Sequence, residues 1–313
     1  MPVEWLMEGE AFIRYRTMID LLNKNKNDKD VTSARREISK EKLIKNILNN
    51  RNQYGYWGVP KDIYTWWPKK DTTFWMLGVL ADFCLDKNTK EIAGACEYVL
   101  NTQLPDGGFG WAPPPTAGDC FTGILTESMA KLGYVSDKRL KKAYGWMIQR
   151  QRHDGGFWCK NTGQPGGPRE NEPSCAFASL CILGAIAQNK ELKRSKLARR
   201  CGEFLLTCWD NRGKIKYAGH DSKMGTGWEK LKYPFTDYRI LKYLDILSQF
   251  EFLKKDKRIA EMMDLLISKQ DDNGRFHAES IHKVWSQFDF GQKQQPSRWI
   301  TFLVHRIARR LIN

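Results

Sequence analysis

A turn motif recurs five times along the chain and constrains the fold more than any other feature of the sequence. Its clearest copy, residues 151–158, reads Gln-Arg-His-Asp-Gly-Gly-Phe-Trp. The copies lie at residues 51–57, 103–111, 151–158, 209–215 and 270–276, so successive copies start 52, 48, 58 and 61 residues apart. A period of this size is typical of a repeated supersecondary unit. Because a closed ring of such units can hold a long chain, we predict a single domain over residues 1–313.

The segments between the motif copies show helical periodicity of two kinds. Segments of the first kind are apolar around most of their circumference, and those of the second kind carry one apolar stripe. The first kind comprises residues 10–23, 71–85, 119–133, 174–189, 236–250 and 297–312, and the second comprises 33–50, 88–102, 137–150, 192–208 and 256–269. Helices of the first kind must be covered on several sides, and no strand alternation competes. We therefore predict an all-α fold, an (α/α)6 toroid in which six inner helices are sheathed by about five outer helices.

The motif is predicted to turn the chain between an outer helix and the next inner helix. Asp-Gly-Gly supplies residues that tolerate positive φ. The Gln side chain is expected to donate to a carbonyl of one helix and to accept from an N–H of its neighbour. Polar side chains that precede the inner segments are predicted N-caps, namely Asp71, Thr72, Asp119, Ser174, Thr236 and Ser297. All inner helices would then begin at one mouth of the ring, where their dipoles favour anions.

The formal charge of +15 raises the question of nucleic acid, but no nucleic-acid motif accompanies it. The densest basic stretch, Lys190–Arg200, falls on an outer segment, where a solvated helix face is the simplest interpretation. Contact with an anionic membrane surface or with a substrate phosphate stays open as the alternative. The protein is therefore not predicted to bind nucleic acid.

Cysteine usage and hydropathy indicate a soluble protein of the reducing cytoplasm. The eight cysteines form no CxxC pair and several fall in apolar helical patterns, as free thiols do. The longest uncharged apolar stretch, Ser174–Asn189, has 16 residues and is too short to span a bilayer. The N-terminal sequence shows no basic region followed by an apolar run, so no secretory signal is expected.

The repeats resemble those of a known family. Motifs of the form QxxDGGFxW on paired helices are similar to the QW-type repeats of the squalene–hopene cyclase and protein prenyltransferase superfamily, over about residues 40–313. More narrowly, Cys120–Gly123, Gly155–Cys159 and Pro296–Thr301 resemble squalene-cyclase-like prokaryotic proteins that have no assigned reaction. The resemblance implies an α/α toroid.

The chain departs from the superfamily's active-site motifs. It has neither the DxDD acid of the membrane cyclases nor the DDxxD of metal-dependent terpene synthases. Protein prenyltransferases hold zinc with Asp-x-Cys, whereas here Asp119 and Cys120 are adjacent and Cys175 follows Ser174. The resemblance therefore transfers no catalytic activity, and whether the protein is an enzyme stays open. If it is one, zinc-assisted prenyl or diphosphate chemistry is the best interpretation.

A weaker zinc pattern remains in the cysteines. Cys120 and Cys175 lie at the starts of successive inner segments, and Cys159 lies in the loop between them. Three thiols from two neighbouring helix starts and their joining loop can converge on one tetrahedral ion. His277 is the predicted fourth ligand, with His282 and His220 as the alternatives. Three unrelated thiols are the competing interpretation.

Aromatic and charged side chains near the starts of the inner segments predict an apolar cavity with a polar mouth. The predicted ligand-binding residues are Trp66, Trp67, Trp75, Tyr238, Arg298 and Trp299, with Phe74 and Phe302 close by. Aromatic faces bind isoprenoid chains and stabilise cations. Arg16, Arg298 and Lys70 are candidates to contact a diphosphate. Ordinary core packing and salt bridging are the alternatives.

Carboxylates fall at the same mouth. Asp119 and Asp237 are predicted as a general acid and base, with Glu172 nearby, although N-capping explains the two aspartates more simply.

The leading functional hypothesis is that the protein binds an elongated apolar ligand, of isoprenoid type, in a central cavity. Two alternatives stay open. A carbohydrate-active enzyme would need two carboxylates facing each other across a groove, and a non-catalytic binding scaffold would need neither.

Overall fold

The computed structural model describes residues 1–58, 72–110, 117–158, 171–215, 217, 227–235 and 239–312. Over these residues the secondary structure is helical, and the only β-type pairing consists of isolated bridges such as Phe157 with Cys175. Among the same residues, no helix combines the length and the apolar character needed to cross a membrane. The predicted all-α class is confirmed.

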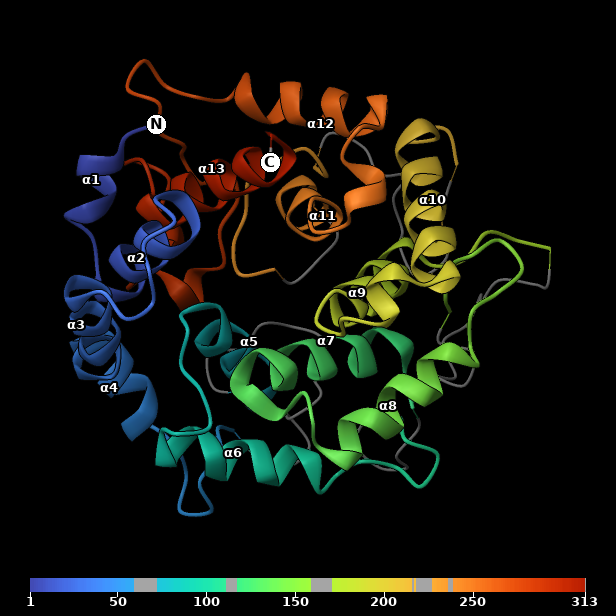
Figure 1. Cartoon of the computed structure of the whole chain (residues 1–313), viewed down its shortest axis with the longest axis horizontal. Helices are drawn as coiled ribbons and strands as arrows, with labels where there is room; N and C mark the ends of the chain where they lie inside the picture. The colour runs from blue at the N-terminus through green and yellow to red at the C-terminus, as the bar shows by residue number, and fades with distance from the viewer. Residues whose placement is uncertain are drawn as a thin grey trace.

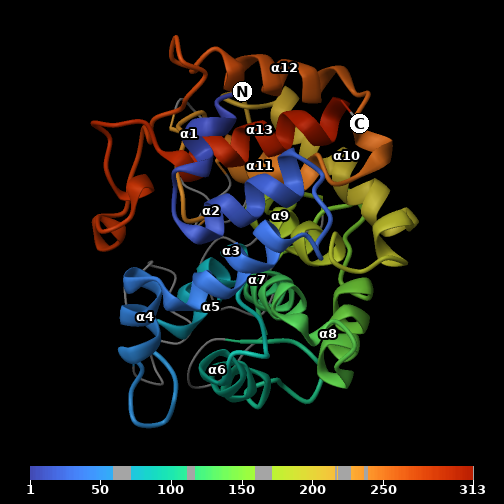
Figure 2. The same cartoon turned by 60° about the vertical axis from the view of Figure 1, so that its left-hand side comes forward.

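The helices form two concentric layers (Figure 1). The inner layer consists of α2 (Ala11–Arg16), α5 (Thr73–Asp82), α7 (Asp119–Met129), α9 (Ala176–Ile186), α11 (Ile240–Leu247) and α13 (Arg298–Ile312). The outer layer consists of α3 (Lys29–Glu37), α4 (Lys42–Asn49), α6 (Lys90–Leu100), α8 (Lys138–Ile148), α10 (Lys196–Asp210) and α12 (Lys257–Ile267), and α1 (Val3–Met7) precedes them. Viewed from a second direction, α13 lies beside α2 and α11 (Figure 2). This is the predicted α/α toroid.

The inner layer closes into a ring. Along the chain, α5 packs on α7, α7 on α9, α9 on α11 and α11 on α13, and α13 packs on α2. The remaining gap is closed by Phe12 of α2 and Phe83 after α5, whose ring centroids stack 3.9 Å apart. Trp299 of α13 meets Phe12 with centroids 5.4 Å apart. The first and last helices therefore meet, as the ring prediction requires.

The outer layer differs from the prediction at its start. Residues 33–50 were predicted as one helix, but the chain turns at Ile38–Lys40 and forms α3 and α4 instead. Glu41 adopts an extended conformation there, and its carboxylate accepts the backbone N–H of Ala11. The break thus places a carboxylate at the N-terminus of α2, where the helix dipole favours it.

Burial follows the two predicted kinds of helix. Every residue of α9 is buried, and Glu127 is the one residue of α7 that is not. Outer helices such as α10 bury one face only. A single core of buried apolar side chains runs from Leu6 to Ile307.

The repeated motif turns the chain as predicted, but the hydrogen bonds of its glutamine differ from the prediction. Gly155 has φ +88°, and a Cβ there would lie 2.5 Å from the carbonyl oxygen of Arg200, so a side chain is excluded twice. The Nε2 of Gln151 donates to the carbonyls of Gly155 and Leu197, both at 2.9 Å. The prediction of one donated and one accepted bond was wrong. Both bonds are donated, and they tie the turn to the first turn of the next outer helix.

A hydroxyl of each following inner helix holds the aromatic residue of the motif. The backbone N–H of Phe109, Phe157 and Phe276 donates to Thr122, Ser179 and Thr301 respectively, each at 2.9 Å. These buried hydroxyls satisfy amides that would otherwise lack a partner. Each repeat is thereby fixed to the start of its inner helix.

The predicted N-caps have mixed outcomes. Ser297 caps α13, because its Oγ accepts the N–H of Ile300 at 3.1 Å. Thr72 precedes α5 without a side-chain cap bond. The helix α9 is capped by Cys175, whose Sγ accepts the N–H of Ala178, while Ser174 binds the motif residue Asp154 instead. Asp71 and Thr236 lie outside the described residues.

Candidate functional site

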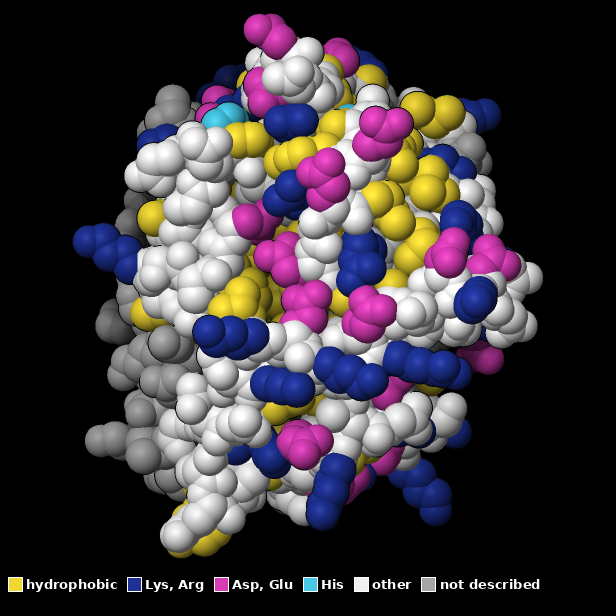
Figure 3. Space-filling model, turned by 90° about the vertical axis from the view of Figure 1, so that its left-hand side faces the viewer, with side chains coloured by type: hydrophobic (Ala, Val, Ile, Leu, Met, Phe, Trp, Pro, Cys, Tyr) yellow, Lys and Arg dark blue, Asp and Glu magenta, His cyan; other side chains and the backbone are white. Residues whose placement is uncertain are grey.

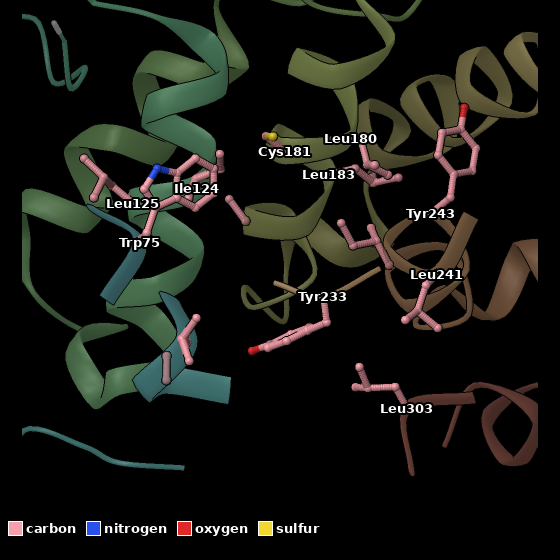
Figure 4. Packing of buried hydrophobic residues seen from close by; sticks show 14 of the residues in the cluster. Trp75, Ile124, Leu125, Leu180, Cys181, Leu183, Tyr233, Leu241, Tyr243 and Leu303 are labelled. Carbon is pink, nitrogen blue, oxygen red and sulfur yellow. The ribbon is translucent and has the colours of Figure 1, made fainter. Parts of the chain in front are cut away.

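The ring encloses a cavity between α5, α7 and α11, bordered by the segment 233–235. Its empty space is ≈ 490 Å³, counting the part open to solvent. The lining residues are Phe74, Trp75, Gly78, Val79, Asp82, Ile124, Glu127, Ser128, Lys131, Tyr233, Pro234, Phe235, Lys242 and Ile246. Figure 4 shows three of them, Trp75 and Ile124 close together and Tyr233 apart from them.

One wall of the cavity is apolar and elongated. Phe74 and Trp75 come from the first turn of α5, and their ring centroids lie 4.8 Å apart with the rings perpendicular. Lining residues continue along α5 as far as Asp82. Because a helix rises ~1.5 Å per residue, the wall extends about 12 Å along the axis of α5. Val79, Ile124 and Ile246 complete the apolar surface.

A cluster of charges lies at the far end of this wall, near the C-termini of α5 and α7. The Nζ of Lys131 lies 3.0 Å from Oδ1 of Asp82 and 2.6 Å from Oε1 of Glu127. Burial alone would lower the pKa of Lys131, but Asp82 and Glu127 outweigh it and raise this pKa above its ordinary value. Lys131 is therefore held charged by two carboxylates.

Tyr233 joins the same cluster. Its hydroxyl donates to the other oxygen of Asp82, Oδ2, at 3.0 Å. Burial and the neighbouring carboxylate of Asp82 raise the pKa of Tyr233 well above its ordinary value, so the phenol stays protonated. Both oxygens of Asp82 thus accept hydrogen bonds, one from an ammonium and one from a phenol.

Lys242 is the second cation of the cavity and differs from Lys131 in its partners. It is the third residue of α11 and is only 4% exposed. Its Nζ lies 3.4 Å from the carbonyl oxygen of Phe235, 3.6 Å from Sγ of Cys181 and 5.1 Å from the ring centroid of Phe177. No carboxylate of the described residues forms a salt bridge with it. Lys242 is a buried cation that faces a cavity and lacks a counter-ion among those residues.

The acidic residue of the same helix is bound elsewhere. Asp245 Oδ1 lies 2.6 Å from Arg306 and 2.9 Å from Arg310, both on α13. Burial would raise the pKa of Asp245, but Arg306 and Arg310 hold it well below its ordinary value. This carboxylate is committed to two guanidinium groups.

The predicted ligand-binding residues divide into three groups. Trp75 lines the cavity, and its role in binding a ligand stays a prediction. Trp299 packs instead in an aromatic cluster with Phe12 and Tyr233, and Arg298 binds the Trp5 carbonyl at 2.9 Å and Glu8 at 3.2 Å. Neither is among the lining residues. Trp66, Trp67, Tyr238 and Lys70 lie outside the described residues. Arg16 pairs with Asp20 at 2.8 Å.

Of the two carboxylates predicted as a general acid and base, the structure describes one. Asp119 is fully buried and is bound by Arg150 through two bonds of 3.0 and 2.9 Å. The guanidinium of Arg150 also stacks over the ring of Trp146, 4.3 Å from its centroid. This bidentate pair gives Asp119 a structural partner. Asp237 lies outside the described residues, so the acid–base assignment stays a prediction.

The zinc set is partly described. Cys120 and Cys175 are buried at the starts of α7 and α9, which pack on each other, and Cys159 and His220 lie outside the described residues. His277 lies beside α13, where its Nδ1 is 3.3 Å from the carbonyl oxygen of Lys293, and α13 packs on α11 and α2 rather than on α7. Within the described part of the chain, no group of three or more His, Cys, Asp or Glu side chains could hold a metal ion. Zinc at Cys120, Cys159 and Cys175 with His277 as the fourth ligand therefore stays a prediction.

Sequence reasoning missed Asp82, Glu127, Lys131 and Lys242. One signal was available, because each of them interrupts a segment that is otherwise apolar around its circumference. Lys242, for example, stands between Leu241 and Tyr243. A charge in such a segment must face a partner or a cavity.

Comparison with known proteins places the fold. Residues 30–162 match the model of the prenyltransferase alpha-alpha toroid domain, which confirms the resemblance predicted from the repeats. No curated protein matches the sequence.

Solved structures similar over the chain include type II terpene cyclases. A variant of the cyclase MstE from Scytonema, in complex with the product merosterolic acid A, has 10% identity and a TM-score of 0.36, covering 89% of this chain and 97% of that chain. A second variant, in complex with the substrate geranylgeranyl dihydroxybenzoate, has 11% identity and a TM-score of 0.35, covering 88% and 97%. A protein from Actinoplanes has 15% identity and a TM-score of 0.36, covering 90% and 99%.

Proposed function

We propose that this protein binds an elongated apolar ligand of isoprenoid type in the cavity between α5, α7 and α11. The observation that carries the proposal is the cavity itself. Its apolar lining residues include Phe74, Trp75, Val79, Ile124 and Ile246. Such a wall gains free energy by removing a hydrocarbon chain from water, at about 25 cal/mol per Å². The rings of Phe74 and Trp75 add contacts to π-bonds or to cationic centres.

The ligand is expected to be long and narrow rather than compact. The lining residues follow α5 from Phe74 to Asp82, and Ile124 of α7 adds an apolar side chain. A chain laid along α5 would contact Phe74, Trp75 and Val79 before it reaches Asp82. A sugar would instead need hydrogen-bonding groups along this apolar stretch.

The carbohydrate-active alternative finds less support. It requires two carboxylates that face each other across a groove, and Asp119 is buried against Arg150. Asp82 and Glu127 share one partner, Lys131. Apolar ligand binding therefore remains the function that these contacts support best.

A cavity-filling variant tests the proposal. Gly78 lines the cavity from within α5, and a Cβ there would lie 3.4 Å from Oγ of Ser128, which is ordinary contact. Gly78→Leu should therefore keep the helix and place an isobutyl group in the ligand's space. Gly94→Leu is the matched control, because Gly94 is an exposed glycine within α6 and a Cβ there meets nothing within 4 Å.

The measurement is titration with geranylgeraniol, followed by quenching of tryptophan fluorescence. We expect saturable binding to the wild type and to Gly94→Leu, and at least tenfold weaker binding to Gly78→Leu. Absence of saturable binding to the wild type, or equal binding to both variants, would contradict the proposal. Mass analysis of the recovered ligand tests for catalysis in the same samples, because a reaction changes the ligand's mass or its retention.

A further inference from the structure

We infer that Lys242 binds the charged head of the ligand and that this head is a single carboxylate. The inference rests on the proposed function and names the class of ligand, an apolar chain that ends in a carboxylic acid. The charges of Asp82, Glu127 and Lys131 neutralise one another, whereas Lys242 has no counter-ion among the described residues.

Lys242 is built into the wall as a buried cation. Only 4% of the surface of Lys242 is exposed. Its ammonium group contacts the carbonyl of Phe235 at 3.4 Å, the thiol of Cys181 at 3.6 Å and the ring of Phe177. All three are weak partners for a full charge. A buried charge is costly unless it is paired, and an ammonium group has three donors to satisfy. An anionic ligand would supply the missing partner.

The acidic side chains around Lys242 are committed to other cations. Within the described residues, Asp82 and Glu127 both bind Lys131, at 3.0 and 2.6 Å. Asp245, from the helix that carries Lys242, binds Arg306 at 2.6 Å. The cavity therefore holds one cation whose counter-ion is not provided by these carboxylates.

The single uncommitted ammonium group favours a monoanion over a diphosphate. The ionisable acids and amines that line the cavity are Asp82, Glu127, Lys131 and Lys242, two of each sign. A diphosphate carries several negative charges and needs several donors. Here it would meet one uncommitted ammonium together with the repulsion of two carboxylates. A carboxylate needs only the one charge that Lys242 offers.

The position of Lys242 also suits a head group with an attached chain. Lys242 lines the same cavity as Trp75 of α5 and Ile124 of α7. One turn further along α11, Ile246 continues the lining. A carboxylate held at Lys242 thus leaves its hydrocarbon chain to pack against Trp75, Val79 and Ile124.

Three ligands of one chain length test the inference on the full-length protein. Farnesoic acid carries a carboxylate, methyl farnesoate has the same shape without the charge, and farnesyl diphosphate carries several charges. Affinities are measured by calorimetry for the wild type, Lys242→Met and Lys242→Arg. The methionine keeps the length and apolar stem of the lysine, and the arginine keeps its charge.

We expect the wild type to bind farnesoic acid roughly ten- to a hundredfold more tightly than its methyl ester, as for a hydrogen-bonded charge pair. Lys242→Met should remove most of this preference and leave the affinity for the ester within about threefold. Lys242→Arg should retain the preference in part. Thermal unfolding of each variant shows whether it is folded. The comparison of acid with ester in the wild type tests the charge even if a variant fails to fold.

Distinct outcomes separate this inference from the proposed function. Equal wild-type affinities for the acid and the ester, or a loss of both in Lys242→Met, would overturn the role of Lys242 while the apolar ligand stands. Tighter binding of farnesyl diphosphate than of farnesoic acid would overturn the monoanionic head. If none of the three ligands and no geranylgeraniol binds, the proposed function falls and the inference with it.

Discussion

The carboxylate of Glu127 lies against Gly184, where a Cβ would come within 2.5 Å of Oε2. Glu127 is also the one residue of α7 that is not buried, and it holds Lys131 at 2.6 Å. The missing side chain on α9 is therefore what lets a charged residue of α7 occupy the space between α7 and α9.

Gly184→Ala is expected to destabilise the protein although alanine favours helices. The added methyl group must displace Glu127 from its place beside Lys131, and overpacking of this kind costs about 1–3 kcal/mol. Urea unfolding measures the change. Gly94→Ala, at the exposed position in α6, is the control and should instead stabilise by about 0.5–1 kcal/mol. Stabilisation by both substitutions would show that Glu127 moves aside freely.

Gln151→Ala tests the bond that ties a repeat turn to the next outer helix. The variant loses two donated hydrogen bonds of 2.9 Å, to the carbonyls of Gly155 and Leu197. Since each net bond contributes ~0.5–1.5 kcal/mol, we expect a loss of about 1–3 kcal/mol in the free energy of unfolding. Gln149→Ala, two residues earlier and exposed, is the control and should change little. Equal effects of the two substitutions would mean that the motif glutamine is not a structural tie.

The toroid could be predicted from the sequence because its determinants are local. A recurring Asp-Gly-Gly turn, an aromatic residue and the apolar circumference of segments such as 174–189 can each be recognised within one stretch of sequence. The hydroxyl ties of the repeats could not be recognised in this way. The residues they join lie 13 residues apart in Phe109–Thr122 and 25 apart in Phe276–Thr301, because the loops between them differ in length.

The cavity could be predicted in its apolar part only. Trp75 was expected from its place at an inner helix start, and it lines the wall. Lys131 and Lys242 were not expected, because their contacts with Asp82 of α5 and Cys181 of α9 form only when the inner helices pack together. The sequence argument also favoured mouth loops, and Arg298 there serves to hold the N-terminal segment through Glu8. Which charges neutralise each other depends on ring closure.

On the face shown in Figure 3, the basic residues do not form a patch that is free of acidic residues. Lysine and arginine side chains alternate there with aspartate and glutamate, and apolar side chains lie between them. On the outer helix α10, Arg200 binds the carbonyl of His153 at 2.7 Å, and Arg199 lies over the ring of Phe252. Part of the basic stretch at Lys190–Arg200 therefore has a structural use.

If Cys120, Cys159 and Cys175 bind zinc together, the protein as isolated should contain about one zinc ion per chain. The three thiols of one chain supply three of the four ligands of one tetrahedral site. Elemental analysis measures it. Cys175→Ser should then lower the zinc content strongly, whereas Cys208→Ser, a buried cysteine of the outer helix α10, should not. Protein that contains no zinc would contradict the prediction.

The raised pKa of Asp289 should make the stability of the folded protein depend on pH. Burial, with the negative charge of Glu10 as the next cause, raises the pKa of Asp289 from an ordinary value of 3.8 to about 6. The folded protein therefore keeps this proton over a range in which the unfolded chain has released it. The contribution of the group to stability is fully present below pH 3.8 and is lost as the pH rises through 6.

Asp289→Asn isolates this effect, because the amide oxygen can still accept the N–H of Trp299, which Asp289 binds at 3.1 Å. Relative to the wild type, the variant should gain stability progressively between pH 4 and pH 7, by about 1–3 kcal/mol in total. Urea unfolding at a series of pH values gives the difference, with Asp272→Asn at an exposed position as the control. Because one deprotonation is involved, the difference should rise once and then level off above pH 7. Parallel curves for the wild type and Asp289→Asn would show that the carboxyl titrates alike in the folded and unfolded chain.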